Sequence, residues 1–241
     1  MYKYIFFLRK AKAILLRLNI HVLIDPFFGF FLNLIYMSKF SKWRKEIGKL
    51  PFDDFYNNNV KYEDRFKLHQ YIFETQRLNE EINYIEFGVA EGTSFKWWVN
   101  KNKNSQTKFY GFDTFTGLPE DFGAMKKHDY DTKGIFPDVN NDPRCTFIPG
   151  MFQSSLKNYI DKIEFSKRLV LHMDADLYSS TLYVLTMLVY KFKKDDIIIF
   201  DEFGVPTHEF KAFFDFLSAY QIKFEYLGAV NNYLQLAIKI L

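Results

Sequence analysis

Cysteine is almost absent from this 241-residue chain, in which Cys145 is the single thiol. A disulfide within the chain is therefore excluded, as is a metal site built from cysteines alone. The chain has no need of an oxidising compartment, so we expect a cytoplasmic protein. Hydrophobic residues make up 48% of the sequence, which is ample for the core of one large α/β domain.

Acidic residues are scarce at the beginning of the chain. Residues 1–50 hold ten Lys and Arg against two acids, a balance of +8, whereas residues 51–241 hold 22 against 27, a balance of −5. Phosphate backbones require a concentrated basic face. Because the larger part of the chain is net negative, we expect no nucleic-acid partner.

The same N-terminal region lacks a long uncharged run. Its two uncharged runs, Leu18–Ile24 and Pro26–Ser38, are shorter than the roughly 20 residues of a spanning helix. It also lacks the small-residue cleavage site of a signal peptide. We therefore expect residues 1–60 to form a basic, apolar helical extension. Three placements stay open: packing on its own domain or on a second copy as a homo-oligomer, peripheral contact with a membrane surface, or a re-entrant or spanning segment.

Short apolar strands alternate with helices along residues 61–241. Strands that are apolar throughout are typical of a parallel sheet covered on both faces. The last two, 224–230 and 233–240, are joined through Asn231-Asn232, as in a hairpin. The sequence therefore predicts an α/β fold: a doubly wound, mostly parallel seven-stranded sheet that ends in an antiparallel hairpin. The earlier predicted strands are 84–87, 108–115, 145–150, 168–173 and 196–200.

The segment YIEFGVAEGTS, residues 84–94, passes from a strand through two glycines into a helix. A glycine turn lets the backbone approach a ligand closely, and the helix start offers free N–H groups. The spacing of Gly88 and Gly92 is not G-x-G-x-x-G, so the dinucleotide fingerprint is missing. Asp113 follows the next strand, where an acid can accept both hydroxyls of a ribose. The pair favours a nucleotide-like ligand, with a turn or cap role for Asp113 as the alternative.

Five acids follow the carboxyl ends of predicted strands. Because such ends lie at one edge of a parallel sheet, their carboxylates should converge there. Crowded carboxylates raise one another's pKa or require a cation, and Mg²⁺ prefers oxygen ligands of this kind. Capping of the next helix by Asp174 or Asp176 stays open. The five acids are Asp113, Asp174, Asp176, Asp201 and Glu202.

Five motifs, in the order in which they follow one another along the chain, resemble those of the macrocin O-methyltransferase family. These enzymes use S-adenosylmethionine to methylate sugar hydroxyls on natural products and glycans. The resemblance covers roughly residues 60–241 and implies a class I methyltransferase domain over residues 61–241 with S-adenosylmethionine and Mg²⁺ as cofactors. The acceptor it implies is a small-molecule or glycan-linked sugar, in glycan, nucleotide-sugar or natural-product biosynthesis. The motifs are YIEFGVAEGTS, YGFDTFTGLPEDFG, IPGMFQSSL, LHMDADLYSST and IIIFDEFG.

The resemblance also implies roles for particular positions. Gly88 and Gly92 would flank the methionine part of the cofactor, and Asp113 would hold the ribose hydroxyls. Similarity to the wider metal-dependent group places Gln153 at the adenine. The further cofactor contacts it implies are Glu86 and Ser94. The metal ligands it implies are Asp174, Asp201 and Glu202.

Catalysis needs a group that removes the proton of the hydroxyl. The lysine that catechol-type enzymes carry near this point is replaced by Leu177, and the resemblance implies that the metal-bound Asp174 acts as the base. The family usually has two aspartates where this chain has Asp201-Glu202, and the extra methylene of Glu202 shifts its carboxylate oxygen. His128 is a second acid–base candidate, with a solvated loop residue as its alternative.

The acceptor side offers fewer signals. Tyr178 and Asp176 are candidates for the acceptor pocket, with core packing as the alternative for Tyr178. Two other functions stay open. An NAD-dependent oxidoreductase would use the glycine turn and Asp113 but not the further acids, and a non-catalytic scaffold would use the N-terminal helix as a membrane or partner contact.

Overall fold

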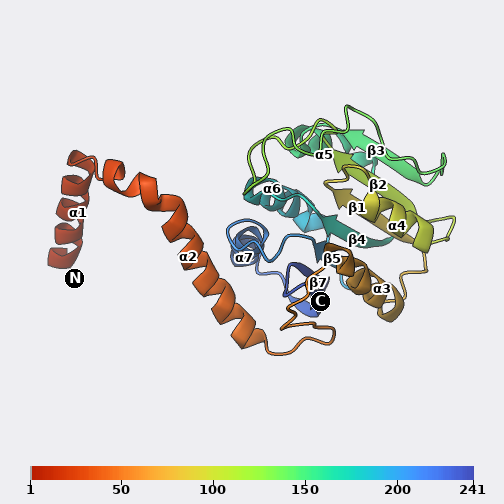
Figure 1. The fold of residues 1–241 in the computed structure, drawn as a ribbon, viewed down its shortest axis with the longest axis horizontal. Coiled ribbons are helices and arrows are strands. Elements are labelled where there is room, and N and C mark those ends of the chain that lie inside the picture. The colour runs from red at the N-terminus through yellow and green to blue at the C-terminus, as the bar shows by residue number, and fades with distance from the viewer. Residues whose placement is uncertain (1) are drawn as a thin grey trace. The chain divides into compact units, whose positions relative to one another are not determined.

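The computed structural model describes residues 2–241, and side chains from residue 4 onward. The chain divides into two units, Met1–Glu46 and Ile47–Leu241. The second unit holds a seven-stranded sheet in the order β3-β2-β1-β4-β5-β7-β6 (Figure 1). The strands are β1 Ile82–Phe87, β2 Lys108–Asp113, β3 Cys145–Pro149, β4 Arg168–Met173, β5 Ile197–Phe200, β6 Phe224–Val230 and β7 Gln235–Ile240.

Strands β1 to β5 run parallel, and β7 is antiparallel to both β5 and β6. All residues of β1 and β5 are buried. This burial explains why β5 is a continuous apolar run, whereas β1 also buries the polar side chains of Asn83 and Glu86. The predicted doubly wound sheet and its C-terminal antiparallel hairpin are confirmed. The hairpin joins the sheet through β7, which pairs with β5, and β6 forms the edge of the sheet.

Helices cover both faces of the sheet. Side chains of α3 and α4 share a hydrophobic core with one face, in which Trp98 and Tyr84 stack with ring centroids 5.1 Å apart. On the other face α5 contacts the sheet through Phe152 and Phe87, and α6 packs between α5 and α7. The helices are α3 Arg65–Thr75 after the short turn η1 Tyr62–Asp64, α4 Thr93–Lys101, α5 Phe152–Tyr159, α6 Tyr178–Leu188 and α7 Glu209–Tyr220.

Residues that precede η1 pack on the C-terminal hairpin. Asp53 pairs with Ala229 as an isolated bridge, and the hydroxyl of Tyr233 donates a hydrogen bond to Asp53 at 2.7 Å. The backbone N–H of Asn57 donates to the side chain of Asn232 at 2.8 Å. These contacts hold residues 53–57 against the C-terminal hairpin, within the unit that begins at Ile47. The expected extension over residues 1–60 therefore shares its last part with the second unit.

The first unit is helical. Helix α1 spans Tyr2–Arg17 and α2 spans His21–Ile47, with Pro26 inside α2. Pro26, the sixth residue of α2, has no N–H to donate to the carbonyl of Val22, and the helix continues past it. Among the described residues, α2 is the one helix long and apolar enough to cross a membrane, judged by length and composition.

Candidate active site

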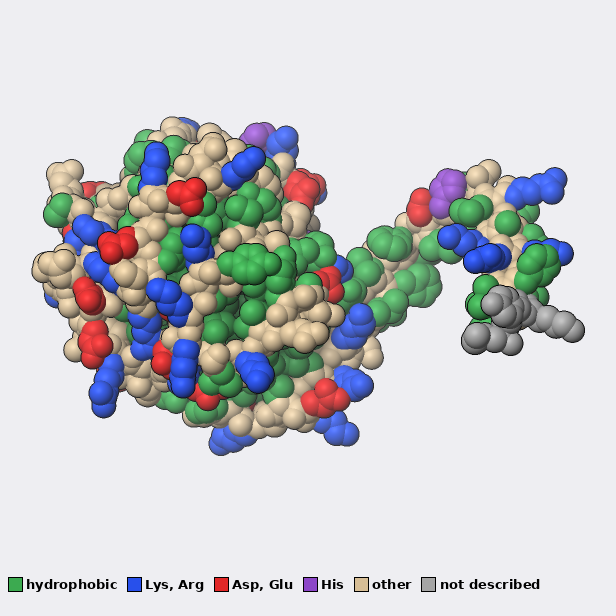
Figure 2. Space-filling view, turned by 180° about the vertical axis from the view of Figure 1, so that it is seen from behind, with side chains coloured by type: hydrophobic (Ala, Val, Ile, Leu, Met, Phe, Trp, Pro, Cys, Tyr) green, Lys and Arg blue, Asp and Glu red, His purple; other side chains and the backbone are tan. Residues whose placement is uncertain are grey.

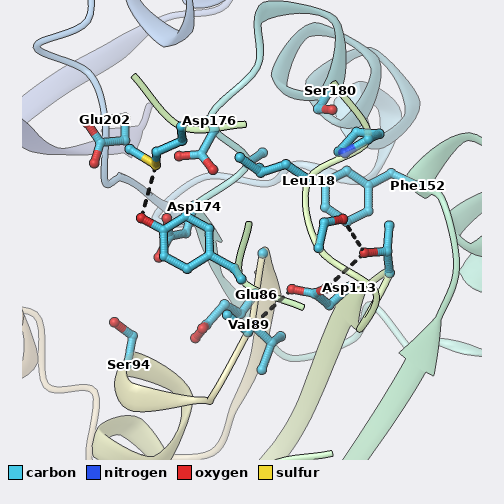
Figure 3. A pocket seen from close by; sticks show the side chains of 18 of the residues that line it. Glu86, Val89, Ser94, Asp113, Leu118, Phe152, Asp174, Asp176, Ser180 and Glu202 are labelled. Atoms are coloured by element: carbon cyan, nitrogen blue, oxygen red, sulfur yellow. Dashed lines mark hydrogen bonds between the residues drawn. The ribbon is translucent and has the colours of Figure 1, made fainter. Parts of the chain in front are cut away.

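A cavity of about 630 Å³ lies at the carboxyl ends of β1, β2 and β4 (Figure 3). Three loops after these strands supply most of its wall, as the topology of a doubly wound sheet requires. Residues of η1 and α3 close another side. The sequence-predicted residues among those that line it are Glu86, Gly88, Ser94, Asp113, Gln153, Asp174, Asp176 and Glu202.

Gly88 and Gly92, the two glycines after β1, have different structural roles. Gly88 has φ +95°, and a Cβ there would lie 1.7 Å from the carbonyl oxygen of Asp174. The loops after β1 and β4 therefore touch only because Gly88 has no side chain. Gly92 has φ +75°, and a Cβ there would lie 2.5 Å from Pro137. Gly92 shapes the start of α4 and is not among the cavity-lining residues.

Asp113 is fixed at the end of β2 by backbone donors. Its Oδ2 accepts the N–H of Ala90 at 2.8 Å, and its Oδ1 accepts the N–H of Phe115 at 2.6 Å. Oδ2 keeps a further lone pair for a ligand hydroxyl, whereas the hydroxyl of Thr114 also lies 3.4 Å from Oδ1. Ser94 is buried at the start of α4, and its hydroxyl has no hydrogen-bond partner among the described residues. This wall of the cavity therefore offers an oriented carboxylate and a free hydroxyl.

Three carboxylates face the other part of the cavity. Figure 3 shows Glu202, Asp176 and Asp174 on the same side. Burial, with the charge of Asp201, raises the pKa of Asp176 to about 7 and that of Glu202 to about 8. Burial and the neighbouring Asp201 also raise the pKa of Asp174 well above its usual value. The crowding expected from the sequence is present, and it favours a bound cation or protonated acids.

Asp201 is fully buried behind this group and is not a cavity-lining residue. Its Oδ2 lies 3.1 Å from Nη1 of Arg65 and accepts a hydrogen bond from the hydroxyl of Tyr62. The same Nη1 lies 3.9 Å from Oδ2 of Asp174. Burial alone would raise the pKa of Asp201, but His172 and Arg65 lower it to about 2. Arg65 therefore links two of the three expected metal ligands.

The donor set fits Mg²⁺ in its chemistry. Asp174 and Glu202 present carboxylate oxygens to the cavity, with Asp176 beside them, and hard oxygen donors are what this ion prefers. Asp201 has one oxygen engaged by Arg65 and Tyr62, while its Oδ1 has no hydrogen-bond partner among the described residues. The expected set of Asp174, Asp201 and Glu202 is thus divided between the cavity wall and the layer behind it.

A buried polar network continues inward from Asp201. Nε2 of His172 lies 3.7 Å from Oδ1 of Asp201, and Nδ1 lies 2.9 Å from the hydroxyl of Tyr84. That hydroxyl donates to Glu86, which lines the cavity near the first turn. Burial opposes charge on His172, yet the carboxylates of Asp201 and Glu86 raise its pKa to about 9. A single chain of contacts thus joins Glu86 to Asp201, with His69 also packed against His172.

Besides Gly92 and Asp201, two further predicted site residues do not line the cavity. His128 is exposed, and its Nδ1 lies 3.3 Å from the carbonyl oxygen of Thr116. Tyr178 turns toward α7, where its hydroxyl donates to Asp215 at 2.9 Å and Nζ of Lys211 lies 3.4 Å from its ring centre. Neither residue lines the cavity. The roles expected for them, acid–base assistance and acceptor binding, have no support in this geometry.

Tyr62 and Arg65 are site residues that none of the sequence motifs includes. Both line the cavity, although they precede the motifs. A signal was present: Arg65 occupies the same helical stripe as Leu68 and Ile72, three and seven residues later, and all three are buried. A charged residue on the buried stripe of an amphipathic helix indicates an internal partner.

Comparison with known proteins agrees with this geometry. The Macrocin-O-methyltransferase (TylF) family matches residues 64–232. The chain belongs to this family. It is accordingly an S-adenosylmethionine-dependent O-methyltransferase and not an NAD-dependent oxidoreductase. No curated protein matches its sequence.

Solved structures similar to this O-methyltransferase share its fold. CalS11, a calicheamicin methyltransferase, has 18% sequence identity and a TM-score of 0.59, over 76% of this chain and 87% of that chain. NovP, an O-methyltransferase, has 20% identity and a TM-score of 0.54, over 74% and 78%. A Mg-SAM structure of cmcI has 16% identity and a TM-score of 0.50, over 73% and 71%.

Proposed function

We propose that this enzyme transfers the methyl group of S-adenosylmethionine to a sugar hydroxyl, in the biosynthesis of a glycan, a nucleotide sugar or a natural product. One observation carries the proposal: a single cavity joins the Gly88 turn and Asp113 to three converging carboxylates. CalS11, which has a similar fold, is described as a TDP-rhamnose 3'-O-methyltransferase. A nucleotide sugar is therefore the first acceptor class to test.

The donor would bind at the β1–β2 side of the cavity. Asp113 would accept the ribose hydroxyls, because backbone donors already orient its carboxylate. Ser94 would contact the methionine part with its unpartnered hydroxyl, close to the Gly88 turn. Glu86 would contact the same part from the end of β1, and Gln153, on α5, would approach the adenine.

The acceptor would bind beside Asp174, Asp176 and Glu202. Asp174 and Glu202 would hold Mg²⁺ at the cavity wall, with Asp201 behind them. When bound, Mg²⁺ supplies positive charge that makes a coordinated hydroxyl more acidic. Arg65 keeps Asp201 charged and in place through a buried contact of 3.1 Å. These residues fix the direction from which the acceptor oxygen meets the donor.

The transfer is an in-line displacement. The acceptor oxygen forms a bond to the methyl carbon, the carbon–sulfur bond breaks, and the hydroxyl proton passes to a carboxylate. We assign this proton to Asp174, and Asp176 is the alternative because it lines the same part of the cavity. S-adenosylhomocysteine and the methylated sugar leave as products.

The decisive experiment incubates the purified enzyme with S-adenosylmethionine, Mg²⁺ and a panel of nucleotide sugars. We expect a mass gain of one methyl group on at least one acceptor, and none with Asp174→Asn. Methylation of other acceptors alone would contradict the sugar proposal. Binding of S-adenosylhomocysteine without turnover on any acceptor would favour a scaffold. Homo-oligomer formation and a cytoplasmic location stay predictions.

A further inference from the structure

The first unit exposes an unusual number of large apolar side chains. Within α2, Phe27, Phe28, Phe30 and Phe31 are 57%, 57%, 63% and 52% exposed. Soluble monomers rarely leave apolar surface of this extent in water. Figure 2 shows hydrophobic side chains gathered along this helical part. The other exposed large apolar residues of α2 are Val22, Leu23, Ile24, Leu34, Ile35 and Met37.

These side chains surround α2 and do not form one stripe. At 3.6 residues per turn, Val22, Leu34 and Phe28 point in three well-separated directions around the helix. A helix that is apolar on all sides is typical of a protein interior or a membrane. Residues 22–38 contain one charged side chain, Asp25, and extend for about 25 Å at roughly 1.5 Å per residue. The hydrocarbon core of a bilayer is about 30 Å thick.

Basic residues flank this apolar stretch on both sides. Lys39, Lys42 and Lys45 follow it within α2 and are exposed. Exposed Lys and Arg side chains precede it on α1, where Nζ of Lys10 lies 4.8 Å from the ring centre of Phe6. Apolar and basic side chains thus alternate on α1, as on helices that lie in the headgroup region. The other exposed basic residues of α1 are Arg9, Lys12 and Arg17.

We propose that residues 4–45 anchor the enzyme to an anionic lipid bilayer, with the apolar stretch of α2 inserted in the hydrocarbon and the flanking basic residues at the phosphate headgroups. A second copy of the chain is a poorer occupant. One partner helix would cover a single side of α2, and the +8 balance of residues 1–50 would repel a like-charged copy. An anionic surface matches both the apolar extent and the charge. This inference does not depend on the identity of the acceptor.

The test measures co-sedimentation of the full-length protein with vesicles of phosphatidylcholine and with vesicles that also contain phosphatidylglycerol. Bound protein is then washed with high salt, which releases adsorbed but not inserted protein. One variant carries Phe27→Ser, Phe31→Ser and Leu34→Ser. The matched control is Tyr190→Ser, because Tyr190 is an exposed aromatic of the catalytic unit (89%). Light scattering reports the oligomeric state without lipid.

A second variant carries Lys39→Gln, Lys42→Gln and Lys45→Gln. We expect the unchanged protein to bind anionic vesicles and to stay bound through the salt wash. The triple serine variant should bind at least about a hundredfold more weakly, and Tyr190→Ser should bind as the unchanged protein does. The lysine variant should bind anionic vesicles at least about tenfold more weakly. Equal binding to both kinds of vesicle would overturn the placement of the basic residues at anionic headgroups. If the protein does not bind vesicles and forms an oligomer that the triple serine substitution dissociates, the proposal is overturned and the apolar surface belongs to a contact with a second copy.

Discussion

Nη1 of Arg65 lies 3.1 Å from Oδ2 of Asp201, and both side chains are buried. The partners come from the start of α3 and the end of β5, so the contact ties the helical layer to the catalytic edge of the sheet. Removing one partner of a buried ion pair leaves an uncompensated charge, which costs more than the pair contributes.

Replacing Arg65 with Met should therefore lower the free energy of unfolding by about 3 to 5 kcal/mol. Urea unfolding followed by circular dichroism measures the change. The control is Lys67→Met, because Lys67 pairs with Asp64 on the surface and should contribute less than about 1 kcal/mol. Equal losses in the two variants would mean that Asp201 is compensated by other groups.

Substitution of Gly88 tests the contact between the loops after β1 and β4. Gly88→Ala would place a Cβ 1.7 Å from the carbonyl oxygen of Asp174 at φ +95°. We expect a loss of at least about 2 kcal/mol in unfolding free energy and at least about tenfold weaker binding of S-adenosylhomocysteine by calorimetry.

The variant Gly134→Ala separates the cost of backbone strain from the cost of a steric clash. Gly134 also has a positive φ, +74°, but nothing lies within 4 Å of its added Cβ. This variant should lose only about 1 kcal/mol, which is the cost of the backbone conformation alone. Similar losses for Gly88→Ala and Gly134→Ala would show that the loops can move apart.

The sheet was predictable because each buried strand is a short, mostly apolar run that a polar or glycine-containing turn ends. β1, β4 and β5 therefore appear in the sequence almost at their observed bounds. The acids after them were predictable for the same reason, since topology alone places strand ends at one edge. No such rule sets the direction of a side chain in the loop that follows.

Tyr178 and Asp201 illustrate that limit. Tyr178 turns to Asp215 on α7, a helix that no motif announces, and Asp201 turns inward to Arg65. Both depend on partners far away in the sequence. His128 likewise lies on a loop whose path is set by its own hydrogen bonds, such as that of its N–H to Leu118 at 2.9 Å. Such pairings follow from the packed structure and leave no local pattern in the sequence.

The thiol of Cys145 should be unreactive in the folded enzyme. It is half-buried in β3, and burial followed by the charge of Asp142 raises its pKa to about 12. Because the thiolate is the nucleophile, little of it exists near pH 8, and the fraction rises only as the pH approaches 12. Alkylation by iodoacetamide near pH 8 should be at least about a hundredfold slower than for free cysteine, and urea should restore the rate. Fast alkylation of the folded protein would show that the strand edge opens.

Asp113 and Asp174 should separate donor binding from turnover. Asp113→Asn loses the charge that strengthens hydrogen bonds to ribose hydroxyls, so S-adenosylhomocysteine should bind at least about tenfold more weakly. Asp174→Asn keeps the shape of the side chain but removes the proton acceptor, so affinity should change by less than about threefold while methyl transfer stops. Calorimetry and a mass assay on the same preparations measure the two effects. Because Asp176 lines the same part of the cavity, Asp176→Asn is the matched control. Turnover that survives Asp174→Asn but not Asp176→Asn would move the proton to Asp176 and leave the donor site as assigned.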